Sequence, residues 1–232
     1  MAATATPLVG REAELRLLVR ILAETHAGRA RAVGIVGQPG IGKSRLLGEL
    51  KRREADGGVL VVEGRASELE RDVPFALWVD ALDDVVAATP EALADVEGEH
   101  LAELAVALPA VARVAGVAPA VTGERHRTAR ALRTLLEHLA VRCPVAVLLD
   151  DVHWADPASA EVVSLLLHRL PRGPVLLTLT ARTGRARARG LAVRRCTAAR
   201  GRGDRARRPL PRGGRRPPGA VGQHTGAGRA FP

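Results

Sequence analysis

Aromatic side chains are scarce in this chain of 232 residues, which contains no tyrosine, two phenylalanines and two tryptophans. Hydrophobic residues still make up 47% of the sequence, so a core has to be built from alanine, valine and leucine. Lysine is equally rare: of 35 basic residues only Lys43 and Lys51 are lysines, which leaves 33 arginines. A composition this rich in arginine, alanine and glycine indicates a gene of high GC content.

Cysteine is also scarce, because Cys143 and Cys196 are the only two. Two isolated thiols exclude a disulfide framework and a cysteine-based metal site. No apolar run approaches the roughly 20 residues that span a bilayer. Residues 1–7 have neither the charge nor the apolar stretch of a signal peptide. We therefore expect a cytoplasmic protein without a membrane partner.

The net charge of +10 is divided very unevenly along the chain. Residues 1–181 hold 20 basic and 24 acidic residues, a net charge of −4, whereas residues 182–232 hold 15 arginines and one acid, Asp204, a net charge of +14. The second segment lacks hydrophobic periodicity and cannot bury enough surface to offset the entropy of ordering. We predict a folded domain at 1–182 and a disordered arginine-, glycine- and proline-rich tail at 183–232.

Short apolar runs alternate with helical patterns through the first part of the chain. The predicted strands lie near 32–36, 59–63, 145–149 and 174–180. The predicted helices cover 12–26, 43–55, 124–142 and 157–170, with a further helical region at 74–107 that breaks near Pro90 and a loop or short helices at 108–123. Strands that are apolar on both faces are typical of a parallel sheet covered by helices on each side. We predict a three-layer α/β domain.

Residues 37–44, with the sequence GQPGIGKS, fit the pattern G-x-x-x-x-G-K-S/T between a predicted strand and a predicted helix. The glycines let successive N–H groups face a phosphate, and the helix adds its positive end. We predict a P-loop in which Lys43 acts on the β- and γ-phosphates of ATP and the Ser44 hydroxyl ligates Mg²⁺. The residues expected to bind the nucleotide here are Gly37, Gln38, Pro39, Gly40, Ile41, Gly42, Lys43, Ser44 and Arg45. The alternative is a glycine-rich turn before a helix.

Two acids, Asp150 and Asp151, follow the buried strand at 145–149. Carboxylates at the end of such a strand lie where Mg²⁺ and an attacking water would sit. We assign Asp150 to Mg²⁺ through a water molecule and Asp151 to polarising the attacking water. The alternative is that these acids cap a helix, an interpretation that suits Asp156, before Pro157, better.

Arg182 ends the next predicted strand. The carboxyl ends of parallel strands line the ligand crevice of an α/β sheet, so an arginine there is positioned to sense the γ-phosphate as part of the catalytic machinery. The alternative is that Arg182 is only the first residue of the basic tail.

Three segments occur in order along the chain: LVGREAEL at 8–15, GQPGIGKSRL at 37–46 and VAVLLDDVHWAD at 145–156. Together they resemble the ATPase module of large LuxR-type transcriptional regulators, which belong to the STAND/AAA-type signalling ATPases. The module is similar to the AAA domain of Orc1-like proteins. The resemblance implies a nucleotide-controlled switch rather than a fast enzyme.

The same resemblance implies that Val9, Gly10 and Arg11 lie near the adenine. His153 and Trp154 also belong to the family's pattern, and the alternative for this pair is packing behind the strand. Such regulators continue with another core strand, a helical lid and a DNA-binding helix-turn-helix, which we do not find in this sequence. We therefore expect an incomplete domain, truncated or shifted in reading frame between about residues 182 and 191.

Three hypotheses for function follow. The first is an ATP-binding switch module that hydrolyses ATP slowly if it is competent, with self-association through an open sheet edge. The second is a nucleic-acid-binding protein that uses the basic tail; because the tail lacks interleaved aromatic residues, its binding to DNA would be non-specific. The third is a truncated fragment that retains the fold and binds no nucleotide. Sequence-specific DNA binding would belong to domains outside this chain.

Overall fold

The computed structural model of this protein describes residues 11–55, 57–121, 124–183 and 195–197. All of them belong to the first of two compact units, Met1–Ala199, and the second, Arg200–Pro232, lies outside the described residues. The expectations for Val9, Gly10, the change of reading frame and nearly all of the basic tail therefore fall outside the described part of the chain.

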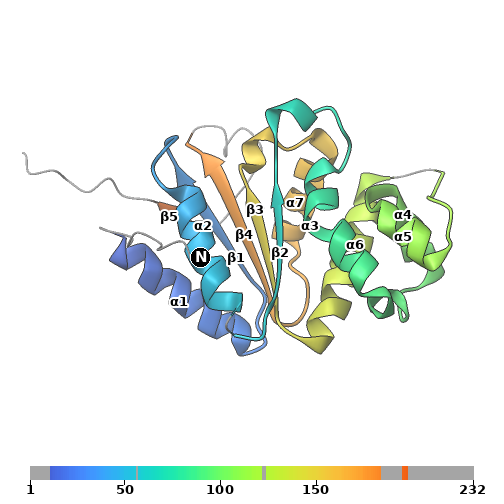
Figure 1. Cartoon of the computed structure of the whole chain (residues 1–232), viewed down its shortest axis with the longest axis horizontal. Helices are drawn as coiled ribbons and strands as arrows, with labels where there is room; N and C mark the ends of the chain where they lie inside the picture. The colour runs from blue at the N-terminus through green and yellow to red at the C-terminus, as the bar shows by residue number, and fades with distance from the viewer. Residues whose placement is uncertain (1–10, 56, 122–123, 184–194, 198–232) are drawn as a thin grey trace, which may run out of the picture. The chain divides into compact units, whose positions relative to one another are not determined.

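A parallel sheet forms the centre of the described unit (Figure 1). Its strands stand in the order β2-β3-β4-β1-β5. Their bounds are β1 Arg31–Gly37, β2 Leu60–Arg65, β3 Val145–Asp150, β4 Val175–Arg182 and β5 Arg195–Thr197. Every pairing between neighbours is parallel, which confirms the predicted sheet and the α/β fold class.

The fifth strand corrects one expectation. The sequence predicts no ordered strand beyond residue 182, yet β5 pairs with β1, with Gly34 opposite Arg195 and Val36 opposite Thr197. The prediction is wrong for these three residues because strand pairing needs only backbone N–H and C=O groups. The outer edge of β1 offers those groups, and a three-residue strand carries no hydrophobic pattern from which it could be predicted.

Helices cover both faces of the sheet (Figure 1). Helices α1 and α2 pack on one face, and α3, α6 and α7 pack on the other, with α4 and α5 outside them. Their bounds are α1 Glu12–His26, α2 Lys43–Ala55, α3 Ala76–Ala88, α4 Gly98–Ala107, α5 Pro109–Ala115, α6 Arg125–Arg142 and α7 Pro157–His168, with 3₁₀ turns at η1 Glu68–Glu70, η2 Pro90–Leu93 and η3 Val152–Trp154. These bounds confirm the three-layer architecture.

The strand β3 shows how its sequence divides between the two cores. Val145, Val147 and Leu149 belong to the larger core, which faces α3, α6 and α7, whereas Ala146 and Leu148 belong to the smaller core beneath α1 and α2. Successive side chains of a strand point to opposite faces, so a strand between two layers of helices has to be apolar at every position.

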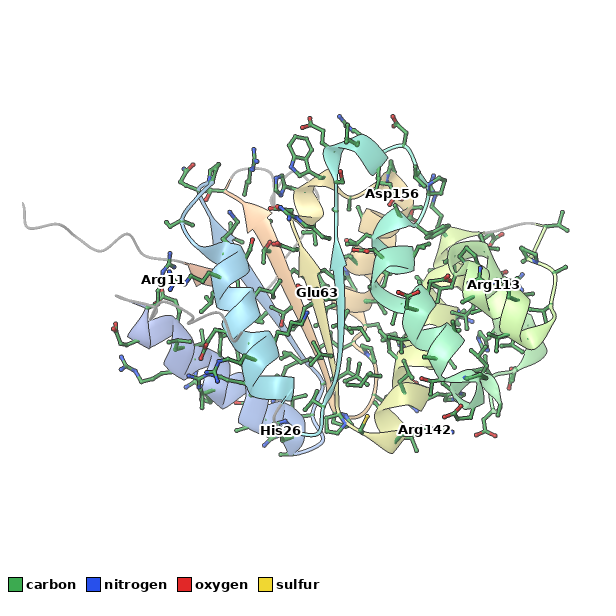
Figure 2. The ribbon with its side chains drawn as sticks, viewed as in Figure 1. Arg11, His26, Glu63, Arg113, Arg142 and Asp156 are labelled. Atoms are coloured by element: carbon green, nitrogen blue, oxygen red, sulfur yellow. The ribbon has the colours of Figure 1, made fainter. Side chains whose placement is uncertain are left out.

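Asp156 fastens the start of α7 to the start of α3 (Figure 2). Its Oδ1 accepts hydrogen bonds from the backbone N–H groups of Ser159, at 2.8 Å, and of Phe75, at 3.1 Å. Pro157 occupies the first turn of α7, as its missing N–H allows. The predicted role of Asp156 as a helix cap is confirmed.

Helix α3 packs unusually close to β2 at Gly64. A Cβ atom added there would lie 2.6 Å from the carbonyl oxygen of Leu77 and 2.9 Å from the Cβ of Ala81. Both neighbours belong to the helix and cannot rotate away, so a glycine is needed for the close approach of helix and strand.

Replacing Gly64 by alanine should lower the free energy of unfolding by about 1–3 kcal/mol, because α3 has to move outward. Gly48→Ala is the matched control: Gly48 lies within α2, an added Cβ meets nothing within 4 Å, and the change should stabilise by about 0.5 kcal/mol or more. Urea denaturation of both variants measures the difference. Equal effects of the two substitutions would contradict the close packing.

Candidate functional site

The loop between β1 and α2 turns sharply at two glycines. Gly40 and Gly42 have φ angles of 72° and 90°, in the left-handed region that side chains with a Cβ disfavour. A Cβ added at either position would meet nothing within 4 Å, so the requirement for glycine comes from the backbone conformation rather than from lack of space. This curl is the one that turns successive N–H groups of a loop toward a common anion.

Lys43, the first residue of α2, is folded into this loop and is only 8% exposed. Its Nζ donates hydrogen bonds to the carbonyl oxygens of Gly37, at 3.3 Å, and Gln38, at 3.1 Å. An ammonium group has three donors and no acceptor, and carbonyl oxygens satisfy it without neutralising its charge. The loop therefore holds a buried positive charge that suits an anionic ligand.

The end of β3 is linked to β4 by a network of hydrogen bonds around Asp150 and Thr180. Both side chains are buried, with exposures of 6% and 0%. Oδ1 of Asp150 accepts from the Thr180 hydroxyl and from the backbone N–H of Asp151, at 3.0 Å, and the same N–H lies 2.8 Å from Thr180 Oγ1. Both hydrogen bonds to the carboxylate fall on Oδ1. The network fixes the position of Asp150 and of the backbone that follows it.

Asp151 itself has a left-handed backbone, with φ 51° and ψ 36°. This conformation is uncommon in residues other than glycine, and where it occurs it is found mainly at functional sites and switch regions. The side chain is 20% exposed; its Oδ2 lies 3.6 Å from Arg65 Nη2, and its Oδ1 lies 3.8 Å from His153 Nδ1. The Asp151 carboxylate is thus partly exposed, whereas that of Asp150 is buried.

Arg182 ends β4 directly beside the start of the loop. The parallel register places it opposite Gly37, and the next residue, Thr183, donates its N–H to the carbonyl of Gly37 at 3.3 Å. Its guanidinium carbon lies 5.5 Å from the centre of the Trp154 ring, a cation–π arrangement that orients the side chain. Trp154 thus contacts Arg182, while its neighbour His153 is buried, with 2% exposure, as the packing interpretation predicts.

Arg11 is the one described residue of the trio that the resemblance associates with adenine. Arg11 lies at the start of α1 (Figure 2). Its Nη2 donates to the carbonyl oxygen of Ile41 in the loop, and its Nη1 lies 3.3 Å from Oε1 of Glu14. Arg11 therefore supports the glycine-rich loop from the side of α1.

A pocket of about 260 Å³ brings these elements together. It is lined by Pro39, Gly40, Gly42, Lys43, Ser44, Arg45, Asp151 and Arg182. Three of these residues are cationic and one is an acid, so the pocket favours an anion. Of the two predicted acids, Asp151 lines the pocket and Asp150 does not. The loop residues Gly37, Gln38 and Ile41 are also not part of its lining.

A family comparison agrees with this geometry. The sequence profile described as AAA ATPase domain matches residues 7–178, which is well over half of the chain. The chain belongs to the AAA ATPase family. This AAA ATPase domain is also 30% identical, over 200 residues, to an uncharacterized protein of Rhizobium meliloti (strain 1021). The match covers 76% of the chain and 18% of that relative, so the chain spans less than a fifth of the relative's length.

Two residues of the site in this AAA ATPase domain are not predicted from the sequence. Thr180 donates a hydrogen bond to Asp150, and its only signal is a hydroxyl, shared with Thr178, inside a largely apolar strand. Arg65 reaches Asp151 from the end of β2, and nothing in its sequence context marks it. Both contacts join strands that are far apart in the chain.

The described residues place two limits on the AAA ATPase domain. Within them, no helix is both long and apolar enough to cross a bilayer. Nor do their histidines, cysteines and acids gather into a group of three or more that would hold a metal ion.

Replacing Thr180 by valine should destabilise the domain by about 1–3 kcal/mol, because it leaves a buried carboxylate and a backbone N–H without their shared hydroxyl. Thr178→Val is the matched control on the same strand. The Thr178 hydroxyl is fully buried and has no hydrogen-bond partner among the described residues, so its removal should be neutral or stabilising. Thermal unfolding compares the two; a larger loss for Thr178→Val would refute the network.

Proposed function

We propose that this AAA ATPase domain binds ATP with Mg²⁺ and acts as a nucleotide-controlled switch within a larger cytoplasmic regulator. The observation that carries the proposal is the cationic pocket in which Lys43, Ser44, Asp151 and Arg182 meet. Lys43 and Ser44 begin α2, Asp151 follows β3, and Arg182 ends β4. The types of these four residues match the needs of a bound triphosphate.

The loop residues 37–45 would hold the phosphates through backbone N–H groups and through Lys43. In support, the Lys43 ammonium is already buried against two carbonyl oxygens, so an anionic phosphate is a better partner than the ones it has. Val9, Gly10 and Arg11 would contribute to the adenine side, as the resemblance to LuxR-type regulators implies.

The residues present suit a magnesium ion, since Ser44 offers a hydroxyl in the pocket and Asp150 offers a buried carboxylate at the end of β3. When bound with the nucleotide, Mg²⁺ neutralises charge on the phosphate oxygens. Because Thr180 and the Asp151 N–H both occupy Oδ1 of Asp150, the other carboxylate oxygen is the one suited to a water-mediated contact.

Asp151 would orient the attacking water, and Arg182 would contact the γ-phosphate. In support, Asp151 is the carboxylate turned toward the pocket, and Trp154 holds the Arg182 guanidinium at the end of β4. The contact of Arg65 with Asp151 restrains the carboxylate before any ligand arrives. Slow hydrolysis would then reset the switch.

The setting in a signalling or transcriptional regulator rests on the resemblance and on the greater length of the matched relative. Self-association belongs to the same proposal, since many proteins of this kind act through assembly. The alternative of non-specific nucleic-acid binding rests on basic residues of 183–232, nearly all outside the described part of the chain.

Lys43→Ala should weaken binding of Mg-ATP by about 10- to 100-fold, the usual effect of losing a charged hydrogen-bond donor. Lys51→Ala is the matched control, because Lys51 is the chain's other lysine, lies on the same helix and pairs with Glu63 at the surface. Titration calorimetry on the full chain measures both. Unchanged affinity in Lys43→Ala would mean that the site is misplaced, and a folded wild type without binding would refute the proposal.

Asp151→Asn should leave Mg-ATP binding within a few-fold of wild type and lower the hydrolysis rate by about 100-fold or more, since an amide does not accept the proton of the attacking water. Asp84→Asn, at an exposed position of α3, controls for the loss of one negative charge. Release of phosphate under single-turnover conditions gives the rate. A rate unaffected by Asp151→Asn would remove this residue from the mechanism.

A further inference from the structure

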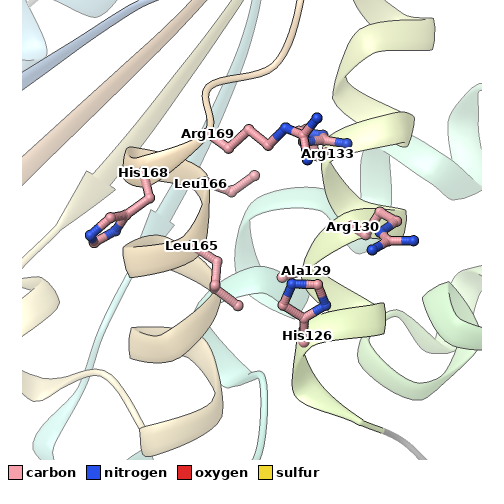
Figure 3. Close-up of a pocket in the computed structure, with 8 residues that line it drawn as sticks. All are labelled: His126, Ala129, Arg130, Arg133, Leu165, Leu166, His168 and Arg169. Atoms are coloured by element: carbon pink, nitrogen blue, oxygen red, sulfur yellow. The ribbon is translucent and has the colours of Figure 1, made fainter.

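A second cationic pocket lies between α6 and α7, apart from the P-loop (Figure 3). It is lined by His126, Ala129, Arg130, Arg133, Leu165, Leu166, His168 and Arg169. Three arginines and two histidines surround it, and none of its lining residues is an acid. Helix α6 supplies His126, Arg130 and Arg133 from one side, while His168 and Arg169 come from the end of α7 (Figure 3).

The other arginines of α6 are paired with acids. Arg125 contacts Glu161 at 3.2 Å, and Arg142 contacts Glu91 at 3.0 Å. Arg127 contacts Glu99 and also Glu103, the latter at 2.9 Å. An arginine on this helix therefore normally has a carboxylate within reach.

The arginines of the pocket are less well paired with acids than the other arginines of α6. Arg130 and Arg169 form no ion pair with any residue in the described ranges. Arg133 has a single acidic neighbour, Glu137, at 3.7 Å from its Nε, and that nitrogen is buried without a hydrogen bond to a described residue. Glu137 in turn accepts a hydrogen bond from the backbone N–H of Arg172 at 2.9 Å.

Such an arrangement favours the binding of an anion. Guanidinium groups that face one space repel one another, and a buried N–H donor without a partner loses its hydration. The end of α7 offsets part of the repulsion, because helix carboxyl ends favour cations and the Nδ1 of His168 lies 2.7 Å from the Ser164 carbonyl. This favours a cation at Arg169, but it leaves Arg130, on α6, without a counter-charge among the described residues and Arg133 with only its 3.7 Å contact to Glu137.

The size of the pocket limits what would fill it. Its volume of about 110 Å³ is less than half that of the P-loop pocket. A space of this size suits a single tetrahedral oxyanion better than a whole nucleotide. A phosphate group carries up to two negative charges near neutral pH and accepts paired hydrogen bonds from arginine forks.

We propose that the α6–α7 pocket is a binding site for a phosphate group, presented by inorganic phosphate or by a small phosphorylated molecule. Arg130, Arg133 and Arg169 are its ligands, and His126 and His168 border it. The site is separate from the P-loop, and the proposal does not depend on ATP binding there.

The test measures binding of inorganic phosphate to the full chain by titration calorimetry at constant ionic strength. The Lys43→Ala variant serves as the background, because the P-loop of the wild type would also attract phosphate. We expect saturable binding in this background. The double substitution Arg130→Gln/Arg169→Gln, at two exposed positions, should weaken it by about tenfold or more.

Arg142→Gln, made in the same background, is the matched control, since Arg142 lies on α6 outside the pocket and pairs with Glu91. It should leave phosphate binding unchanged. A repeat with glycerol 1-phosphate in place of inorganic phosphate identifies the source of the phosphate group. Tighter binding of glycerol 1-phosphate would indicate a small phosphorylated molecule, and tighter binding of inorganic phosphate would indicate the free ion. Absence of saturable binding, equal weakening by Arg142→Gln, or equally tight binding of acetate would each overturn the assignment.

Discussion

The site depends on the parallel register of β1, β3 and β4. Parallel strands end at the same edge of the sheet, so the P-loop after β1, the acids after β3 and Arg182 at the end of β4 meet although more than 100 residues separate the first from the second. The pairing of Gly37 with Arg182 is the decisive contact, because it sets a cation beside the first residue of the loop. A shift by one residue would turn Arg182 toward the opposite face.

Local strain accompanies this convergence. Asp151 has a left-handed backbone although it is not a glycine, and Gly40 and Gly42 have positive φ angles in the loop opposite it. Such conformations persist only where the surroundings hold them. Here the buried Thr180 hydroxyl binds both the Asp150 carboxylate and the Asp151 N–H, so the rigid interior of the sheet supports the strained turn at its edge.

Positive charge is concentrated in two places with different supports. In the P-loop pocket the cations come from strand and helix ends, and the curled backbone orients them. In the α6–α7 pocket they come from the faces of two adjacent helices, and no curled loop is involved. The contrast with the paired arginines elsewhere on α6 distinguishes the second pocket from an ordinary solvated surface.

Much of this protein could be predicted from local patterns alone. The glycine spacing of the P-loop, the apolar run of β3 and the capping sequence around Asp156 each depend on residues close together in the chain, so the sequence by itself determined the α/β fold, the parallel sheet and the loop at residues 37–44. Only the tertiary structure decided that β5 pairs with β1, that Arg65 reaches Asp151, and that arginines of α6 and α7 line one pocket. The physical reason is distance along the chain: backbone pairing and charge contacts between remote segments leave no periodicity in the sequence, whereas helices, strands and glycine turns do.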